Sequence, residues 1–198
     1  MPDSEKPRQM EFRIIAGSLK GKKITSPDLG VTRPPLTRLR KSIFDFLMPY
    51  IREASYLDLY SGTGSYLFEA VSRGASQAEG IEMETILADT INAQAEKFGI
   101  ADRLTCICDD LFRRVPKLVS SGKQYDIVMM APPQYQGLVD KTLNLLFKHR
   151  VTRPDSLIIC QHDTSETEEI TFDRFTLLQR RKYGNTTFTV FNGQQRRT

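Results

Sequence analysis

The sequence predicts an α/β fold built on an open, mostly parallel sheet, with a β-hairpin added at the N-terminus. Three observations support this prediction. Short apolar runs alternate with helical patterns between residues 56 and 160. The first of these units, residues 56–64, is a strand that leads into a glycine-rich turn and then a helix. Near the C-terminus, two strand-like runs are separated only by Gly184-Asn185, which is typical of an antiparallel hairpin.

The composition indicates one soluble domain of 198 residues, with 39% hydrophobic and 26% charged residues. No apolar run approaches the roughly 20 residues that span a bilayer, and the N-terminus is polar. We therefore expect a cytoplasmic protein without a membrane partner, and a monomer. The three cysteines, Cys106, Cys108 and Cys160, are expected to be reduced core thiols. Their spacing does not suit zinc, so no metal site is expected.

The positive charge is concentrated at the N-terminus. The whole chain carries +4, but residues 1–41 hold ten Lys/Arg against four Asp/Glu, and residues 42–198 hold eighteen against twenty. A localised basic segment favours a polyanionic partner, most commonly nucleic acid. The alternative is a solvated, disordered basic tail.

The N-terminal region divides into a tail and an extension. Residues 1–10 are predicted to be disordered, and residues 11–36 to form a basic RNA-binding extension. Within it, the apolar residues around Phe12 and the Lys-rich run that ends at Ile24 predict a short β-hairpin. The main domain is expected to occupy residues 37–198.

The main domain is expected to begin with a helix. Thr37 is a suitable N-cap, and Pro49 is expected to stop the helix. Its apolar residues recur at helical spacing and form one stripe: Leu39, Ile43, Phe44 and Leu47.

Strands and helices then alternate. The five strands expected in the parallel part are residues 56–60, 78–82, 104–108, 125–130 and 157–160. The helices expected between them are residues 66–73, 84–98, 111–119 and 138–147. The hairpin strands, residues 175–183 and 186–191, complete a seven-stranded sheet. A parallel sheet with such a terminal hairpin is the Rossmann-like arrangement of Class I methyltransferases.

The glycine turn predicts a ligand site. Gly62 and Gly64 allow close approach of backbone amides to a ligand, and we expect the amides from Ser61 to Gly64 to be exposed. Asp58 is a carboxylate near the end of a buried strand, which is costly without a partner. A dinucleotide-binding turn needs a third small residue where this chain has Leu67, and this argues against a nicotinamide dehydrogenase.

S-adenosylmethionine suits this turn better, because it carries a cationic sulfonium and an amino group instead of phosphates. Glu82 ends the second strand and can accept hydrogen bonds from ribose hydroxyls. Asp109 ends the third strand, where a carboxylate can accept from an adenine amine. Asp110 is also a plausible helix N-cap, which is its structural alternative. The residues expected to bind the cofactor are Asp58, Ser61, Gly62, Gly64, Glu82, Met83, Asp109 and Asp110.

The loop after the fourth strand is expected to bind the substrate, because open α/β sheets bind ligands beyond the strand carboxyl ends. Pro132 and Pro133 stiffen this loop and leave carbonyls free to accept from an exocyclic amine. Amino-methyltransferases carry Asp/Asn-Pro-Pro-aromatic in the corresponding loop, where the aromatic ring stacks on the flipped base.

From Arg13 to Phe191 the chain resembles the RsmD-type family, which methylates the exocyclic amine of a guanine (guanine N2) in small-subunit ribosomal RNA. The most family-specific matches are Arg13-Ile14-Ile15-Ala16-Gly17 and Ser72-Arg73-Gly74-Ala75. Further matches are Thr32-Arg33-Pro34, Arg38-Leu39-Arg40, Ile43-Phe44, residues 58–64, Glu69-Ala70, Ile81-Glu82, Pro132-Pro133, Gly137-Leu138 and residues 183–186. The resemblance implies a Class I methyltransferase domain over residues 37–198, S-adenosylmethionine as cofactor, and the small ribosomal subunit or its RNA as partner. It also implies that the N-terminal hairpin grips RNA.

The chain departs from the family pattern at the substrate loop. The family has Asp where this chain has Ala131, and Tyr or Phe where it has Gln134. It also usually has Asp at Thr37 and Glu at Lys41, so the first helix is more basic here. A methyl group at Ala131 cannot orient the guanine amine, and the loss of such a group commonly costs 10²–10⁴-fold in rate.

Three outcomes follow for the residues expected to act in catalysis, which are Ala131, Pro132, Pro133, Gln134 and Tyr135. In the first, Gln134 supplies an amide oxygen and Tyr135 the stacking ring. In the second, the backbone carbonyls of Ala131 and Pro132 are enough to orient the amine. In the third, the protein binds cofactor and RNA as an assembly factor with weak or no catalysis. The RNA-binding side chains are expected to be Lys20, Lys22, Lys23, Arg33, Arg38 and Arg40.

Overall fold

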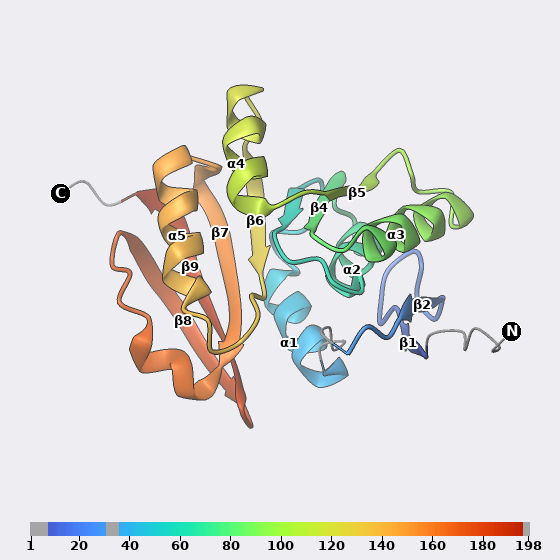
Figure 1. Cartoon of the computed structure of the whole chain (residues 1–198), viewed down its shortest axis with the longest axis horizontal. Coiled ribbons are helices and arrows are strands. Elements are labelled where there is room, and N and C mark those ends of the chain that lie inside the picture. The colour runs from blue at the N-terminus through green and yellow to red at the C-terminus, as the bar shows by residue number, and fades with distance from the viewer. Residues whose placement is uncertain (1–7, 31–35, 196–198) are drawn as a thin grey trace, which may run out of the picture.

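The computed structural model describes residues 8–30 and 36–195, which form a seven-stranded sheet with helices packed on it and a separate hairpin (Figure 1). The strands of the sheet are β3 (Ser55–Asp58), β4 (Gln77–Glu82), β5 (Leu104–Cys108), β6 (Tyr125–Met130), β7 (Thr152–Asp163), β8 (Phe175–Tyr183) and β9 (Thr186–Gln195). Their order across the sheet is β5-β4-β3-β6-β7-β9-β8. The first five pair in parallel, and β9 is antiparallel to both β7 and β8. The predicted seven-stranded, mostly parallel sheet with a C-terminal antiparallel hairpin is confirmed.

Five α-helices lie in the described part of the main domain: α1 (Thr37–Leu47), α2 (Ser65–Ser72), α3 (Thr85–Lys97), α4 (Leu111–Ser120) and α5 (Leu138–His149). Side chains of α1, α2 and α3 share one apolar core, and those of α4 and α5 belong to a second. The sheet therefore has a buried core on each face, as parallel sheets require. No helix within residues 8–30 and 36–195 is long and apolar enough to cross a lipid bilayer.

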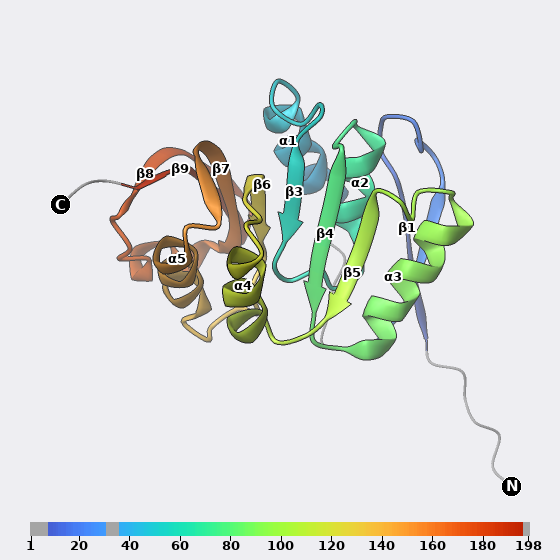
Figure 2. The ribbon, with the colours of Figure 1, turned by 90° about the horizontal axis from the view of Figure 1, so that it is seen from above.

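The predicted N-terminal hairpin is confirmed. It consists of β1 (Gln9–Arg13) and β2 (Lys23–Pro27), which pair antiparallel in a sheet of their own. Its backbone is tied to α3, because the Gln94 carboxamide exchanges two 2.8 Å hydrogen bonds with the N–H and carbonyl of Thr25. Figures 1 and 2 show this hairpin and the β8–β9 hairpin at opposite ends of the molecule.

Some predicted boundaries need correction. Residues 1–7 of the expected disordered tail lie outside the described residues, but β1 includes Gln9 and Met10, so the tail is shorter than expected. The N-cap of α1 is Leu36 rather than Thr37, which is the first residue of the helix. A 3₁₀ helix, η1 (Thr164–Glu169), was not predicted, since its polar sequence carries no apolar period.

The helix α1 buries the predicted apolar stripe, Leu39, Ile43, Phe44 and Leu47. The Phe44 ring lies between two tyrosines, with centroid distances of 6.3 Å to Tyr56 of β3 and 6.2 Å to Tyr66 of α2. Each such buried apolar side chain contributes roughly 1.5–3 kcal/mol to folding. This packing fixes α1 over the strand and helix that flank the glycine turn.

All three cysteines are free thiols. Cys106 and Cys160 are buried as predicted, but Cys108 is exposed, so its prediction as a core thiol was wrong. The reason is position, because Cys108 is the last residue of β5, where the strand leaves the covered part of the sheet.

Candidate active site

Three acidic residues lie where three adjacent strands end. Asp58 is the last residue of β3, Glu82 is the last residue of β4, and Asp109 directly follows β5. Figure 2 shows these strands side by side, with their arrowheads pointing the same way. The three carboxylates that the sequence singled out therefore lie along one edge of the sheet, where open α/β folds bind their ligands.

The Asp58 carboxyl group is fully buried and only partly satisfied. Its Oδ1 accepts a long hydrogen bond of 3.4 Å from the Tyr60 N–H, and its Oδ2 has no partner among the described residues. Burial raises the pKa of Asp58 to about 7; the Tyr60 N–H opposes this effect and the Glu82 carboxylate adds to it. A buried oxygen without a partner is rare and costly. It fits a ligand that donates hydrogen bonds or carries positive charge, such as the amino group of S-adenosylmethionine.

The glycine turn is held by bonds within the chain. The N–H of Ser61 donates to the Ile81 carbonyl at 3.1 Å, and the N–H of Gly64 donates to the Ser61 carbonyl at 2.7 Å. The N–H of Gly62 donates to Glu82 Oε2 at 2.6 Å. The expectation that the amides of Ser61, Gly62 and Gly64 are exposed to a ligand was therefore wrong. The turn uses them to fix its own shape.

Gly64 ends the turn in a conformation that only glycine adopts easily. Its φ is +76°, in the left-handed region, and it is the N-cap of α2. A Cβ atom at this position would lie 2.8 Å from Ile91 Cγ1. Gly64 is therefore required both by the backbone and by the packing of α3 against the turn.

Glu82 fixes the loops on both sides of it. While its Oε2 accepts from Gly62, its Oε1 accepts from the Glu84 N–H at 3.0 Å. The carboxylate is half-buried and keeps unused lone pairs, since each of its oxygens can accept two hydrogen bonds. Met83 follows it with a side chain that is 69% exposed at the same edge.

Asp109 and Asp110, both expected at the cofactor site, make different contacts. Asp109 Oδ1 accepts from the Asp110 N–H at 2.9 Å, and its Oδ2 pairs with Lys117 Nζ at 3.3 Å. Asp110 caps α4, because its Oδ1 accepts from the Phe112 N–H at 2.7 Å, so the helix-cap alternative is confirmed. In the described residues, no group of three or more His, Cys, Asp or Glu side chains is placed to hold a metal ion.

Gly80 of β4 is a site residue that the sequence reasoning missed. A Cβ atom there would lie 2.5 Å from Ser61 Oγ and 2.6 Å from Leu67 Cδ1. Dinucleotide-binding turns achieve close helix–strand packing with a small residue in the helix. Here the large residue, Leu67, lies in the helix and the small one in the strand beneath it. A glycine inside a strand pattern is the signal that could have identified it.

The Pro-Pro loop follows β6, which lies directly beside β3 in the sheet. Ala131 packs against the core shared with α1 and α2, and Pro132 is buried. Pro133, Gln134 and Tyr135 are exposed. The structure thus brings the expected substrate loop to the same edge as Asp58, but it places the Gln134 carboxamide in solvent.

Tyr135 is held by a residue that the sequence reasoning did not single out. Its N–H donates to Glu166 Oε1 at 2.8 Å, and Tyr135 has a left-handed φ of 60°. Glu166 is buried and its Oε2 accepts from the Asp163 N–H at 3.2 Å, which completes a capping box on η1. The Ser165 N–H and hydroxyl lower the pKa of Asp163, and the Tyr135 hydroxyl adds to this effect. The Tyr135 ring remains 68% exposed.

Of the side chains expected to contact RNA, four are exposed, one lies outside the described residues and one is buried. Lys20, Lys22 and Lys23 are exposed in and beside the loop of the N-terminal hairpin, and Arg38 is exposed on α1. Lys23 forms an ion pair with Glu11, and Lys22 Nζ lies 4.7 Å from the centroid of the Phe98 ring. Arg33 lies outside the described residues.

Arg40 is buried, so its prediction as an RNA-binding residue was wrong. Its side chain is 1% exposed, its Nη2 donates to the Arg13 carbonyl at 2.6 Å, and its Nε lies 3.8 Å from Glu69 Oε2. Burial lowers the pKa of Arg40, and the Glu69 carboxylate opposes that effect. The guanidinium acts inside the protein, where it joins α1 to the N-terminal extension.

Glu69 of α2 is the centre of this junction. It is fully buried and accepts hydrogen bonds from the N–H groups of Ile15 and Ala16 at 2.9 and 3.1 Å. Nearby, a Cβ atom on Gly17 would lie 1.8 Å from the Ser72 carbonyl oxygen. The extension is therefore docked on the helix that follows the glycine turn.

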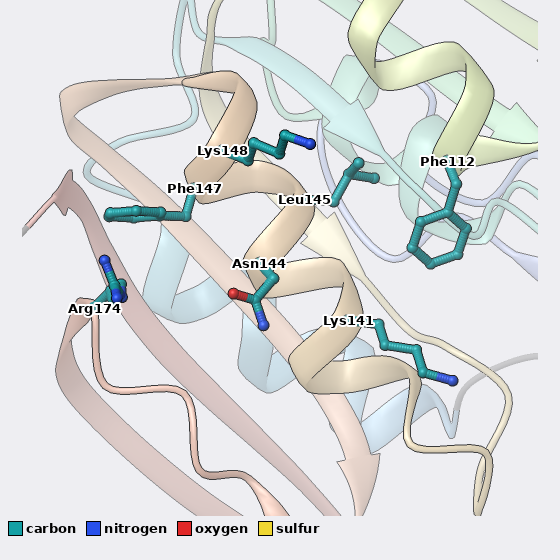
Figure 3. Close-up of a pocket in the computed structure, with 7 residues that line it drawn as sticks. All are labelled: Phe112, Lys141, Asn144, Leu145, Phe147, Lys148 and Arg174. Atoms are coloured by element: carbon teal, nitrogen blue, oxygen red, sulfur yellow. The ribbon is translucent and has the colours of Figure 1, made fainter.

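A groove of about 470 Å³ lies beside α4 and α5, on the face of the sheet opposite α1, α2 and α3 (Figure 3). Phe112, Lys141, Lys148 and Arg174 are among the side chains that line it. Figure 3 shows Arg174 beside the Phe147 ring, and its guanidinium carbon is 5.2 Å from the ring centroid. None of the predicted site residues that the structure describes lines the groove.

Comparisons with known proteins agree with this geometry. The family model described as Conserved hypothetical protein 95 matches residues 12–192. The Ribosomal RNA small subunit methyltransferase D of Escherichia coli (strain K12) is 31% identical over 77% of this chain and 75% of its own length. The protein of the same name from Haemophilus influenzae is 26% identical and covers 91% of this chain and 93% of its own.

Solved structures share the fold. A protein from Escherichia coli superposes with a TM-score of 0.82 at 24% identity, covering 94% of this chain and 100% of its own. An RNA methyltransferase from Salinibacter ruber, solved in complex with S-adenosyl-L-homocysteine, has a TM-score of 0.64 at 15% identity, covering 84% and 97%. The predicted Class I methyltransferase fold is confirmed. With a family model matched over almost its entire length, the chain belongs to the Conserved hypothetical protein 95 family, the RsmD-type family of these curated relatives.

Proposed function

We propose that this protein transfers a methyl group from S-adenosylmethionine to the exocyclic amine N2 of a guanine in small-subunit ribosomal RNA. The observation that carries the proposal is the buried Asp58 Oδ2, which has no partner among the described residues and lies at the edge shared with Glu82 and Asp109. The substrate class rests on the family, since its curated relatives from two bacteria are named for small-subunit ribosomal RNA.

The cofactor would lie along the ends of β3, β4 and β5. Asp58 Oδ2 would accept from its amino group, and Glu82 would accept from the ribose hydroxyls with the lone pairs that the loop amides leave free. Asp109, held by Lys117, would accept from the adenine amine. Met83, exposed beside Glu82, would pack on the adenine ring.

The chemistry demands little of the protein beyond orientation. S-adenosylmethionine supplies a methyl group already activated by its cationic sulfur. In the proposed reaction the guanine nitrogen forms a bond to the methyl carbon, the carbon–sulfur bond breaks with its electron pair retained by sulfur, and the nitrogen loses one proton to water. The side chains of this chain must hold the amine in line and keep its lone pair out of the purine ring.

The substrate loop supplies part of that orientation. The carbonyl of Ala131 or of Pro132 would accept one of the two amine hydrogens, in a loop that Pro132 and Pro133 stiffen. The exposed Tyr135 ring would stack on the flipped guanine. Glu166 keeps the loop in place through the Tyr135 N–H.

The RNA would be held by the N-terminal extension, residues 11–36, and by α1. Lys20, Lys22 and Arg38 are exposed cations that would contact phosphates without reading sequence. Arg40 and Glu69 act indirectly, since they dock the extension on the main domain.

Transfer of tritium from labelled S-adenosylmethionine tests this function. Small subunits and naked ribosomal RNA from a strain that lacks the modification serve as substrates, and Glu82→Ala serves as the cofactor-binding control. We expect incorporation with the natural chain and at least a tenfold loss with the control. No incorporation by a chain that still binds S-adenosyl-L-homocysteine in calorimetry would contradict the proposal.

A second candidate function follows from Ala131. Without the acid that the family carries there, the protein would bind cofactor and RNA as a ribosome-assembly factor with weak or no catalysis. The Ala131→Asp variant separates the two candidates. A rate gain of a hundredfold or more would favour the assembly factor, whereas an unchanged rate would mean that another group already holds the amine.

A further inference from the structure

We propose that the Gln161 carboxamide holds the target amine in place of the acid missing at Ala131, an inference that rests on the proposed function. Gln161 lies in β7, outside the substrate loop, and none of the sequence motifs includes it. Four features of the structure support this role: its register, its face of the sheet, its tether and its exposure.

The register of the sheet places Gln161 beside Ala131. β6 and β7 run parallel, and their last paired residues are Met130 and Cys160. The next residues along the two strands are Ala131 and Gln161. Adjacent parallel strands lie about 4.8 Å apart, so a polar group on one strand reaches the position that its neighbour leaves apolar.

Alternation along the strands puts both side chains on one face. Met129 and Ile159 point into the core shared with α1 and α2, and Ala131 packs against that same core. Because side chains two residues apart share a face, Gln161 follows Ile159 onto this side. Its partner in β9 is Phe188, which also belongs to that core.

A buried tyrosine tethers the carboxamide. The Tyr66 hydroxyl, on α2, donates to Gln161 Oε1. Burial raises the pKa of Tyr66 far above its usual range, and the Asp58 carboxylate adds to this effect, so the hydroxyl keeps its proton and remains a donor. Tyr66 thereby connects the proposed cofactor site to Gln161. It would act as a positioning residue, since it reaches the amine only through the carboxamide.

The free capacity of the carboxamide matches the substrate. Tyr66 uses one lone pair of Oε1, the second remains, and the two N–H groups of Nε2 have no partner among the described residues. Gln161 is half-buried, so part of its side chain is accessible. Oε1 would accept from the guanine N2 amine while Nε2 donates to the ring nitrogen N3. Gln134, by contrast, is exposed in the loop, and no partner among the described residues orients it.

Kinetics with labelled S-adenosylmethionine and small subunits give the first test. Gln161→Leu should lower kcat by about 10- to 100-fold, the effect of removing one oriented hydrogen bond to the reacting group. It should leave the KM for S-adenosylmethionine and the Kd for S-adenosyl-L-homocysteine within twofold. Gln124→Leu, an exposed glutamine that immediately precedes β6, is the matched control and should change none of these values.

Two further variants separate a chemical role from a structural one. Tyr66→Phe should lower kcat by about three- to tenfold, because Gln161 is still present but the Tyr66 hydroxyl no longer orients its carboxamide. Adding Ala131→Asp to Gln161→Leu should raise kcat at least tenfold above that of Gln161→Leu alone. A merely structural role for Gln161 would show no such rescue and would weaken cofactor binding in parallel.

A binding measurement keeps the inference independent of turnover. The side-chain NH₂ resonance of Gln161, assigned by its loss in Gln161→Leu, is followed in the complex with S-adenosyl-L-homocysteine during titration with guanosine or inosine. Guanosine should shift it at a concentration at least tenfold lower than inosine, which keeps N3 but lacks the 2-amino group that Oε1 would bind. Equal or absent responses, or a wild-type kcat in Gln161→Leu, would overturn the inference. A selective response without methyl transfer would refute the proposed function and leave the inference standing.

Discussion

Asp58→Asn gives the sharpest test of the proposed cofactor site. The natural carboxyl is fully buried, one of its oxygens has no partner among the described residues, and its pKa is raised to about 7. A cationic amino group pairs only with the ionised form. Binding below pH 7 must therefore release a proton, and the apparent Kd should grow by the factor 1 + 10^(pKa − pH).

With a pKa of about 7 for Asp58, this factor is about 100 at pH 5 and about 2 at pH 7. S-adenosyl-L-homocysteine should therefore bind roughly 50-fold more weakly at pH 5 than at pH 7. Calorimetry in buffers of different ionisation enthalpy should detect release of nearly one proton at pH 5. Asp58→Asn should bind more weakly at pH 7 and show less than threefold dependence on pH. A natural chain without pH dependence, or a variant that retains all of it, would refute the reasoning.

The raised pKa of Asp58 weakens cofactor binding at low pH, but it stabilises the ligand-free fold there. The pKa of Asp58 is higher in the folded chain, so the neutral carboxyl favours folding below pH 4, and this stabilisation is lost as the pH rises through 7. A rise from 3.8 to about 7 corresponds to about 4 kcal/mol. Asp58→Asn should therefore gain stability relative to the natural chain between pH 4 and pH 8, which urea unfolding without ligand measures. If the difference in unfolding free energy between the variant and the natural chain were the same at every pH, the carboxyl would not titrate in this range.

Three further predictions concern Gly17, Gly80 and Ala131, and a Gly21 variant serves as a control. Gly17→Ala places a Cβ atom 1.8 Å from the Ser72 carbonyl oxygen and should undock the extension, lowering RNA affinity in filter binding at least tenfold. Gly21→Ala is its control, with a similar φ of +83° but nothing within 4 Å, and should keep RNA affinity within threefold. Gly80→Ala should raise the Kd for S-adenosyl-L-homocysteine more than tenfold in calorimetry, because it displaces the glycine turn, and unchanged affinity would contradict the packing argument. Ala131→Asp should raise kcat less than tenfold if Gln161 already holds the amine, and a larger gain would count against that role.

Residues with strong local patterns were predictable from the sequence. The bounds predicted for β5, β6 and β8 match the structure. β5 and β6 are short, largely apolar runs, and β8 ends where Gly184-Asn185 breaks the hairpin. Asp58 and Glu82 were identifiable because a carboxylate that closes an apolar strand is conspicuous. These residues depend on their neighbours in sequence, so short-range reasoning suffices.

Residues whose role depends on distant partners were not predictable in this way. Arg40 looked like an exposed helix cation, but Glu69 and the Arg13 carbonyl draw it inside. Glu166 acts on Tyr135 from 31 residues away, through a 3₁₀ helix without an apolar period. Gln161 gains its place beside Ala131 only from the register of two strands. In each case the informative contact joins segments that the sequence keeps apart.

Mass mapping of the methylated RNA decides the central proposal. Small subunits that lack the modification are incubated with the natural chain and S-adenosylmethionine carrying a deuterated methyl group, and their RNA is digested to nucleosides and to mapped fragments. We predict one labelled product, N2-methylguanosine, at a single position of the small-subunit RNA. A labelled methyl group on another base, or an unlabelled RNA despite bound cofactor, would contradict the proposed function.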